Sequence, residues 1–303
     1  MNENPLVSIV IPVYNREQLI IYSLRSAQCQ TYPNIEIVIV DNQSTDNTWQ
    51  ILNQEAKKDV RIKIFQNENN LGPVRNWERC FTYACGEYVK ILWSDDLIDP
   101  EFISETINVF EKDVAFVMSG ITIFSSDEQE IWKSKFQRNR QILVSEYLDD
   151  VLIKNAIGFP VSPGCAIFRR TDLIDSLRID IPNTENLKFE KYGAGNDLLL
   201  FLLTAVRASY TKIICIDKFL SMFRDHNGSI SVNESHKLSI YYDWSKWYFI
   251  KNYYHIPSKI KMFKSQILIN TYRLKYNKYL IKDIRSSYSF TYLLGKIYKL
   301  FIK

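Results

Sequence analysis

Two adjacent carboxylates, Asp95 and Asp96, follow an apolar segment that ends at Trp93. Neighbouring carboxylates repel each other, so the pair favours a divalent cation that carries a nucleotide diphosphate. The alternative needs no ligand, because an Asp-Asp pair can also cap the helix that follows it. Ser94 and the two aspartates are therefore the first candidates for a binding site.

Other polar groups also follow apolar segments. Pro12 to Asn15 comes after the first such segment, and Asp41 opens the run Asp-Asn-Gln-Ser-Thr-Asp after the second. The carboxylate of Asp41 could accept an N–H from a nucleobase. After the third segment, a tight turn at Gly72 delivers Arg75 to the start of a helix, where a guanidinium suits a diphosphate or a sugar. Helix capping or strand termination is the alternative for each group.

The elements that position these residues alternate between strand and helix. We predict strands over 6–11, 35–40, 60–65 and 88–93, and helices over 16–28, 44–58 and 74–84. This order is typical of a parallel sheet covered on both faces, whose ligands bind at the carboxyl ends of the strands. The candidate residues all follow those ends.

The second half of the chain has weaker patterns. We expect a helix over 101–111, a strand over 114–124, a polar and mobile segment over 125–141, a helix over 145–154, a strand over 165–168, a helix over 196–208 and a strand over 213–216. From about residue 234 onward the pattern is helical. We therefore predict two regions, 1–230 and 231–303.

The charge is unevenly distributed. Residues 251–303 carry a net charge of +11 within a total of +4, which leaves −7 for the remainder. Lys and Arg alternate there with Tyr, Ile, Leu and Phe, which favours an amphipathic helix on an anionic membrane surface. Packing of these helices on the rest of the chain, with solvated lysines, is the alternative. We expect no nucleic-acid partner, because no nucleic-acid motif accompanies the charge.

Composition excludes several classes of protein. The chain has 303 residues and is 46% hydrophobic, which is enough to bury a core, but no apolar run approaches the roughly 20 residues of a membrane span. The first residues do not resemble a signal peptide. Five cysteines without a CxxC spacing predict reduced thiols. No Gly-rich turn follows the first strand, which argues against a dehydrogenase and a nucleotidyltransferase.

Taken in order, the motifs resemble those of the family 2 glycosyltransferases, which are inverting enzymes with the GT-A fold. The matching segments are Val7–Asn15, Asp41–Asp46, Asn70–Gly72, Gly86–Tyr88 and Ser94–Asp96. The resemblance covers about residues 6–125, with weaker support to 231. It implies an α/β, Rossmann-like, mainly parallel sheet with a helical C-terminal extension, and a nucleotide-diphosphate sugar, expected to be a UDP-sugar, as donor.

The resemblance also implies roles for individual residues. It assigns the nucleotide-sugar site to Pro12, Tyr14, Asn15, Asp41, Arg75, Ser94 and Asp95. It assigns a bound Mn²⁺ or Mg²⁺ to Asp95, Asp96 and His226. Asp41 would bond the uracil edge, and Asp95 would contact the ribose and the cation. Trp93 stands where the family's D-x-D motif has its first Asp, so metal dependence is open.

A base is also implied, because the acceptor hydroxyl must lose its proton as it attacks the anomeric carbon. The segment from Gly193 to Leu200 is similar to the family's Glu-Asp pair at the start of a late helix, with Asn196 in place of Glu and Asp197 as the base. His226 lies in a segment that resembles the family's closing loop. A helix-dipole role for Asp197 and a structural role for His226 are the alternatives.

We therefore predict a cytoplasmic glycosyltransferase, peripheral on the inner face of the cell membrane. It would pass a sugar to a glycan, expected to be polyprenyl-pyrophosphate-linked, in O-antigen, capsule or exopolysaccharide synthesis. The rival prediction is a nucleotide-sugar-binding or scaffold protein that keeps the fold without turnover. Trp93 and Asn196, which depart from the family pattern, motivate that rival.

Overall fold

A computed structural model of the chain describes residues 4–127, 129–134, 136, 140–154, 159–160, 162–183, 185–229 and 235–254. The chain divides into two units, residues 1–254 and 255–303. The predicted boundary at residue 230 falls before this division. The second unit, with most of the predicted basic membrane-binding segment, lies outside the described residues.

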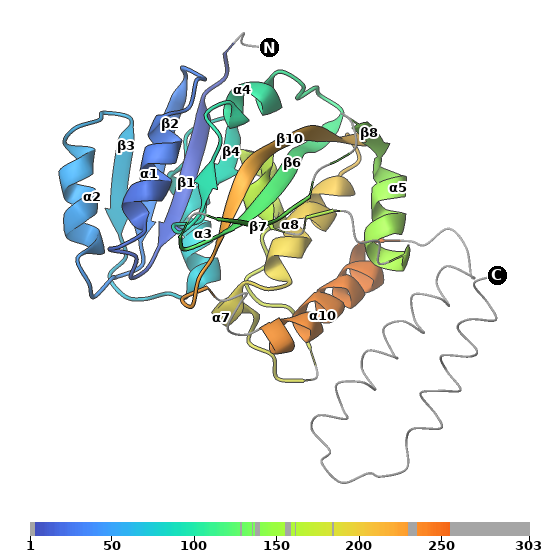
Figure 1. Ribbon diagram of the computed structural model, residues 1–303. Helices are drawn as coiled ribbons and strands as arrows, with labels where there is room; N and C mark the ends of the chain where they lie inside the picture. Colours follow the sequence, from blue (N-terminus) through green and yellow to red (C-terminus); the bar gives the residue numbers. More distant parts are fainter. Residues whose placement is uncertain are drawn as a thin grey trace. The chain divides into compact units, whose positions relative to one another are not determined.

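A ten-stranded sheet forms the centre of the first unit (Figure 1). Its order is β3 (Ile62–Gln66), β2 (Ile35–Asp41), β1 (Val7–Val13), β4 (Tyr88–Ile91), β9 (Ala166–Arg169), β6 (Val114–Ser125), β10 (Lys212–Asp225) and β5 (Leu97–Ile98), with β7 (Glu130–Ser134) paired to β6 and β8 (Arg140–Leu143) paired to β10. Strands β1 to β4, β6 and β10 run in one direction, and the other four run against them. The prediction of a mainly parallel sheet is confirmed.

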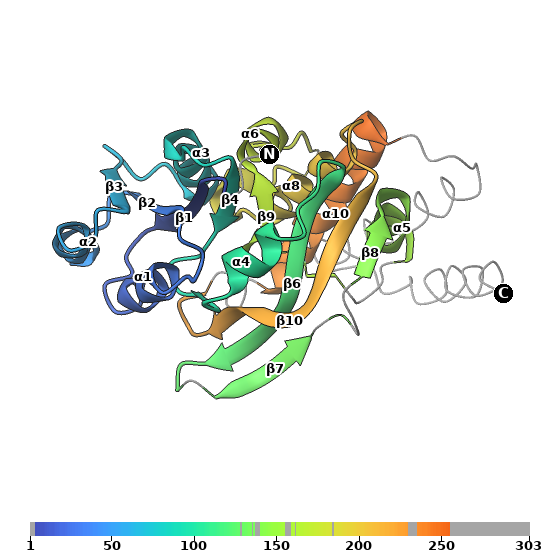
Figure 2. The ribbon, with the colours of Figure 1, turned by 90° about the horizontal axis from the view of Figure 1, so that it is seen from above.

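Helices cover both faces of the sheet, as the view in Figure 2 shows. Helices α1 (Ile20–Gln28), α2 (Thr48–Ala56) and α4 (Phe102–Ile107) lie on one face, and α3 (Pro73–Tyr83), α6 (Arg170–Ser176) and α8 (Asn196–Ala205) lie on the other. Successive side chains of a strand point to opposite faces. In β1, Ile9 and Ile11 therefore pack in the core beneath α1, α2 and α4, while Val10 packs in the core beneath α3, α6 and α8. Both faces are therefore apolar, which explains the unbroken apolar runs in the sequence.

The C-terminal half of this unit closes one end of the sheet. Helix α7 (Phe189–Tyr192) precedes α8, and the long helix α10 (Ser235–Tyr253) packs on α8. Helix α5 (Val144–Asp149) continues as a turn of π-helix over Asp150–Lys154. No helix among the described residues combines the length and the apolarity that a bilayer span requires.

Two expectations about the second half need correction. The segment 125–141, expected to be polar and mobile, contains β7 and the start of β8, because pairing with β6 and β10 satisfies backbone groups that the sequence pattern does not reveal. The strand expected over 213–216 belongs to the 14-residue β10. Register shifts in β10 interrupt the alternation of apolar residues and hide its length.

Candidate active site

A cavity of about 700 Å³ opens at the carboxyl ends of β1 and β4. Its wall is completed by the end of β10, the loop before α8, and α10. The lining residues whose side chains could bind a ligand or take part in a reaction are Pro12, Tyr14, Arg16, Trp77, Trp93, Ser94, Asp95, Asp96, Lys191, Tyr192, Asp197, Arg224 and Tyr242. The size is typical of a small-molecule site, and the position is the one expected for a ligand of an open α/β sheet.

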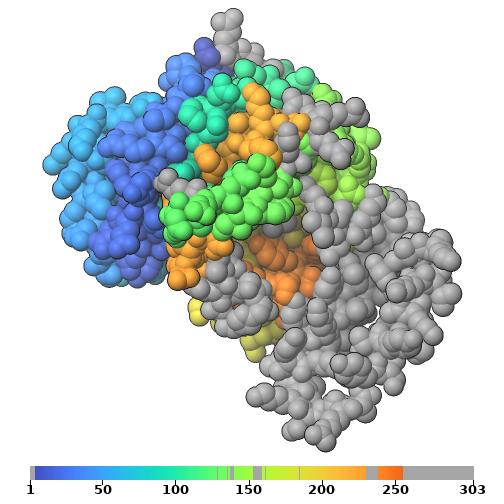
Figure 3. Space-filling model, viewed as in Figure 1, coloured from blue at the N-terminus to red at the C-terminus, as the bar shows by residue number. Residues whose placement is uncertain are grey.

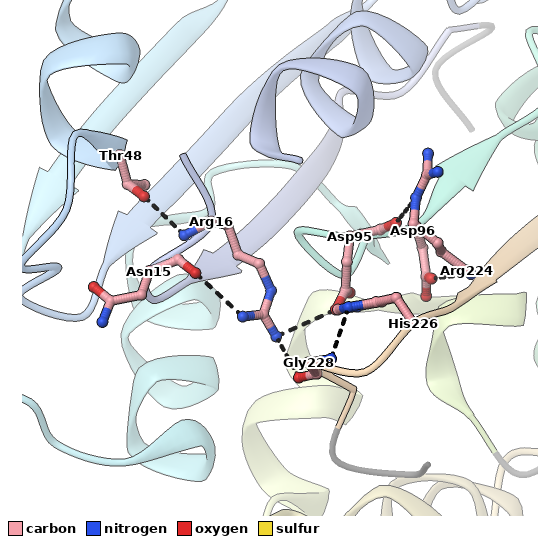
Figure 4. Close-up of polar contacts among 8 residues, drawn as sticks. All are labelled: Asn15, Arg16, Thr48, Asp95, Asp96, Arg224, His226 and Gly228. Carbon is pink, nitrogen blue, oxygen red and sulfur yellow. Dashed lines mark hydrogen bonds and ion pairs between the residues drawn. The ribbon is translucent and has the colours of Figure 1, made fainter. Parts of the chain in front are cut away.

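Arg16 and Asp95 line one wall of this cavity, and His226, which is not a lining residue, contacts Asp95 there (Figure 4). Arg16 Nη2 donates to Asp95 Oδ2 at 3.3 Å and to the Gly228 carbonyl at 3.2 Å. His226 Nε2 lies 3.0 Å from the same Asp95 oxygen. Burial alone would raise the pKa of Asp95, but the hydrogen bond with His226 and the positive charge of Arg16 lower it. Asp95 is therefore ionised at neutral pH.

Asp96 turns away from this group. Its Oδ1 accepts the backbone N–H of Arg224 at 2.9 Å, and the residue is only 6% exposed. Burial, followed by the charge of Asp95, raises the pKa of Asp96 well above its ordinary value. Within the described part of the chain, no three His, Cys, Asp or Glu side chains converge on a common metal position. The predicted ligand set of Asp95, Asp96 and His226 is therefore not assembled, because Asp96 holds β10 instead.

A divalent cation still fits two of those side chains. Ligands of an octahedral cation at about 2.1 Å lie about 3 Å apart, and Asp95 Oδ2 and His226 Nε2 are separated by 3.0 Å. The Gly228 N–H donates to His226 Nδ1 at 3.1 Å. Binding through Nε2 requires the ring proton to sit on Nδ1, so Gly228 must release that bond. Asp95 and His226 would then hold the cation, with donor diphosphate oxygens as further ligands.

Trp93 occupies a structural position in the cavity wall. Its indole Nε1 donates to Ser162 Oγ at 3.0 Å, and its ring centroid lies 5.1 Å from that of Trp77. A Cβ on Gly164 would lie 2.9 Å from the same nitrogen, so the indole packs directly on that backbone. Where the family pattern has a carboxylate, this chain therefore has an aromatic surface.

Asp197 faces the cavity from the first turn of α8. Its Oδ1 accepts the N–H groups of Gly195 at 2.8 Å and Leu198 at 2.7 Å, and its Oδ2 accepts the Tyr242 hydroxyl at 2.8 Å. Burial nevertheless raises the pKa of Asp197 to about 7. A carboxyl group with that pKa can both lose and accept a proton near neutral pH.

Two glycines allow the chain to reach this position. Gly193 and Gly195 have φ angles of 72° and 85°, which L side chains rarely adopt. A Cβ on Gly193 would lie 2.3 Å from the Trp77 ring, and one on Gly195 would lie 2.2 Å from Ser245 Oγ. The segment Gly-Ala-Gly-Asn-Asp therefore sets the backbone path that delivers Asp197 to the cavity.

The residues predicted for the nucleoside separate into two groups. Pro12 and Tyr14 line the cavity, and Tyr14 is 40% exposed. Asn15, at φ 50°, is not a lining residue: its N–H donates to Ser44 Oγ at 2.9 Å, and its Oδ1 accepts the Thr45 N–H at 2.8 Å. Asn15 therefore joins the loops that follow β1 and β2.

Asp41 and Arg75 also lie outside the cavity lining, whereas Ser94 lines it. Asp41 is fully buried, and its Oδ2 accepts hydrogen bonds from Gln66 at 2.8 Å and from the Ser44 N–H at 3.2 Å. Arg75 is half-exposed and pairs with Glu190 at 3.7 Å. In the structure these contacts occupy both side chains, so their roles in nucleotide binding stay predictions.

Three cavity-lining residues that hydrogen-bond to Asp95, Asp96 or Asp197 were not predicted from the sequence: Arg16, Arg224 and Tyr242. Arg16 directly follows the Pro-Val-Tyr-Asn motif, and its cationic character beside that motif was the available signal. Arg224, whose Nε donates to the Asp95 carbonyl at 3.2 Å, precedes His226 by two positions. Tyr242 lies in a helical segment with no motif, so nothing in the sequence connects it to Asp197.

Comparison with known proteins agrees with this geometry. A model of the family described as "Glycosyl transferase family 2" matches residues 8–177, more than half of the chain. An uncharacterised glycosyltransferase of Haemophilus influenzae is 25% identical over 255 residues, which are 83% of this chain and 93% of the relative. A candidate teichuronic acid biosynthesis glycosyltransferase of Bacillus subtilis, TuaG, is 29% identical over 77% of this chain and 84% of its own length.

A shorter but closer match involves an Escherichia coli protein named UDP-Glc:alpha-D-GlcNAc-diphosphoundecaprenol beta-1,3-glucosyltransferase WfaP. It is 40% identical over 111 residues, which are 37% of this chain and 43% of the relative. The match spans less than half of that relative.

Solved structures show the same fold. Residues 1–349 of Staphylococcus aureus TarS, in complex with UDP, superpose with a TM-score of 0.62 at 19% identity, over 93% of this chain and 76% of that one. The mannosyltransferase PcManGT from Pyrobaculum calidifontis, in complex with GDP-Man and Mn²⁺, superposes with a TM-score of 0.59 at 15% identity, over 100% of this chain and 82% of that one. The predicted GT-A fold is confirmed.

Proposed function

Because the chain belongs to glycosyl transferase family 2, we propose that it transfers a sugar from a UDP-sugar to a hydroxyl of a lipid-linked glycan, with inversion at the anomeric carbon. The reaction would serve bacterial surface-polysaccharide synthesis. The observation that carries the proposal is that Asp197 lines the same cavity as the charged group of Asp95 and Arg16. A proton acceptor and a diphosphate site are thereby combined in one cavity.

The donor proposal rests on the cavity wall at β1 and β4. Pro12 and Tyr14 offer surface to a nucleoside, while Arg16 offers a guanidinium to the diphosphate. TarS was solved with UDP, and the E. coli relative is named for UDP-Glc, which supports uridine as the base.

In the proposed step, the acceptor oxygen attacks the anomeric carbon as the bond from that carbon to the diphosphate oxygen breaks. The acceptor's proton passes to the Asp197 carboxylate, and UDP leaves with the bonding electron pair. Tyr242 and the two backbone N–H groups hold the carboxylate in place. Arg16 opposes the negative charge that develops on the departing diphosphate.

We propose Mn²⁺ or Mg²⁺ as the cofactor, bound by Asp95 and His226. When bound, the cation supplies further positive charge to the diphosphate. The PcManGT structure contains Mn²⁺, which supports the choice. Because Trp93 removes one carboxylate from the family pattern, we expect weaker metal dependence than a complete acidic motif would give.

The acceptor and the location are proposed from the relatives and from the charge of the chain. The E. coli relative is named for a diphosphoundecaprenol-linked GlcNAc acceptor. A membrane-embedded acceptor requires the enzyme at the membrane surface, and the +11 charge of residues 251–303 suits an anionic inner leaflet. Peripheral attachment at the cytoplasmic face follows as a proposal.

The competing proposal is a nucleotide-sugar-binding protein without turnover. It is favoured by Trp93 in the acidic motif and by Asn196, whose Nδ2 donates to the Arg178 carbonyl at 2.6 Å and which is fully buried. Asn196 therefore acts as a structural residue where the family pattern has a second carboxylate.

Calorimetric titration of UDP, dTDP and GDP into the full chain, with Mn²⁺ or with EDTA, tests the donor proposal. We expect UDP to bind most tightly and Mn²⁺ to strengthen its binding. Release of UDP from a panel of UDP-sugars, in the presence of alkyl-diphosphate-linked sugars, then tests transfer. UDP binding without any turnover over that panel would favour the competing proposal, and no nucleotide binding would refute both.

A further inference from the structure

Three apolar residues lie in register across the outer part of the sheet. Phe223 of β10 is the partner of Ile123 in β6, and Ile123 is the partner of Trp132 in β7. Side chains of residues directly opposite each other lie on the same face of a sheet. Phe223 and Ile123 both line the cavity, so the Trp132 side chain continues their row on the cavity's face of the sheet.

Trp132 is the outer end of this row. It is 48% exposed, and neighbouring strands lie about 4.8 Å apart, so its backbone is about 5 Å beyond that of Ile123. Strand β7 pairs only with β6 among the described strands and lies at the surface of the unit (Figures 2 and 3). An indole at the end of an apolar row therefore extends the cavity wall to the surface.

The row leaves the cavity away from the proposed nucleotide site. Pro12 lies in β1 and Tyr14 directly follows it, whereas Trp132 lies in β7, on the opposite side of β6 from β10. The row thus starts at β10, beyond whose end Gly228 contacts Arg16 at 3.2 Å, and Trp132 is two strands further out. A molecule that enters from this side would be the second substrate.

We propose that Trp132 forms a subsite for a sugar ring of the acceptor glycan. The inference rests on the proposed function, since it assigns a binding residue to the acceptor of that reaction. An indole offers a large, rigid apolar face together with one N–H donor. A pyranose ring has a matching apolar C–H face and hydroxyl groups at its edge, so it can cover the exposed indole while its hydroxyls stay hydrated.

The neighbouring residue Ile131 provides a matched control. It is 55% exposed on the same strand, but it lies at the irregularity where the partners of Ile123 and Phe124 are Trp132 and Glu130. Ile131 therefore faces no cavity-lining partner across β6. Truncating either side chain removes exposed apolar surface from β7, and only Trp132 belongs to the row.

The test is calorimetric titration of octyl-diphosphate-linked GlcNAc, Glc, Gal and GalNAc into the full chain saturated with UDP. Trp132→Ala should weaken binding of the preferred sugar probe about fivefold to tenfold, as expected for losing half of a large apolar contact. Trp132→Phe should restore most of the affinity, and Ile131→Ala should leave it unchanged. UDP affinity should be equal in all of these chains.

Several outcomes would overturn the inference. Equal affinity of the wild type and Trp132→Ala for the sugar probes would do so, and so would wild-type chain that binds UDP but none of these probes. If octyl diphosphate without a sugar shows the same dependence on Trp132, the strand binds the alkyl chain. If Trp132→Ala instead changes the sedimentation of the chain, β7 joins two copies. Loss of UDP binding in the wild type would refute the proposed function itself.

Discussion

Replacing Asp197 with asparagine should abolish sugar transfer and, at the same time, stabilise the folded chain at neutral and alkaline pH. Asparagine cannot accept the acceptor's proton. Its side-chain oxygen can still accept the N–H groups of Gly195 and Leu198, and its amide can donate to the Tyr242 oxygen. The substitution therefore removes the ionisable group while it conserves the hydrogen bonds that position it.

The magnitude follows from the pKa of Asp197, which burial raises from 3.8 to about 7. Between these values the unfolded chain has lost a proton that the folded chain retains, so the wild-type free energy of unfolding falls as pH rises. A shift of this size corresponds to about 4 kcal/mol. Water in the cavity screens part of it, so we expect about 2 to 4 kcal/mol. The advantage of Asp197→Asn is absent below about pH 4 and complete above about pH 7.

The assay is urea denaturation of the wild type and Asp197→Asn from pH 5 to pH 8, together with UDP release in the presence of an acceptor. Asp180→Asn, at an exposed position on the same unit, is the control and should follow the wild type. A constant difference in stability across this pH range would refute the reasoning about the buried carboxyl group. Transfer by Asp197→Asn at the wild-type rate would remove Asp197 from the role of base.

Three further predictions concern the surroundings of the site. Arg16→Gln should weaken UDP binding about tenfold to a hundredfold, as loss of a charged hydrogen bond implies. Calorimetric titration of UDP checks this, with Arg25→Gln, a half-exposed position, as the control. Equal UDP affinities of the two variants would contradict the prediction. Gly193→Ala should lower the free energy of unfolding by about 2 to 4 kcal/mol, because it combines a positive φ with an overlap on the Trp77 ring; an unchanged urea midpoint would exclude this strain. Tyr242→Phe removes a hydrogen bond that lowers the pKa of Asp197. The acidic limb of the pH–rate profile should therefore move to higher pH by about one pH unit. An unchanged profile would show that Tyr242 does not influence the base.

The N-terminal half of the fold could be predicted because its signals are local. Strands such as Val7–Val13 and Ile35–Asp41 are buried on both faces, which produces continuous apolar runs that end in polar motifs. Helix α1 begins at Ile20 rather than Arg16, a small error, because helix ends depend on capping contacts with other segments. The order of strands and helices then determined the edge of the sheet at which ligands bind.

The second half could not be predicted to the same degree, because its elements depend on partners distant in the chain. Strand β7 exists through its pairing with β6, and the segment between α7 and α8 packs closely on Trp77 at Gly193 and on Ser245 at Gly195, which no periodicity reveals. The aromatic row that ends at Trp132 depends on register between three strands. Register of this kind is a property of the assembled sheet.

The sequence by itself determined the fold class, the family and most of the residue types at the site. Only the tertiary structure decided which of them act together. Asp95 meets Arg16 and His226, which are 79 and 131 positions away, while the adjacent Asp96 turns to Arg224. Asp41, which the motif assigned to the nucleobase, is fully buried and bonded to Gln66. The reason is physical, since a polar side chain inside a protein is directed by the hydrogen-bond partners that folding brings to it, and those partners are seldom its neighbours in the chain.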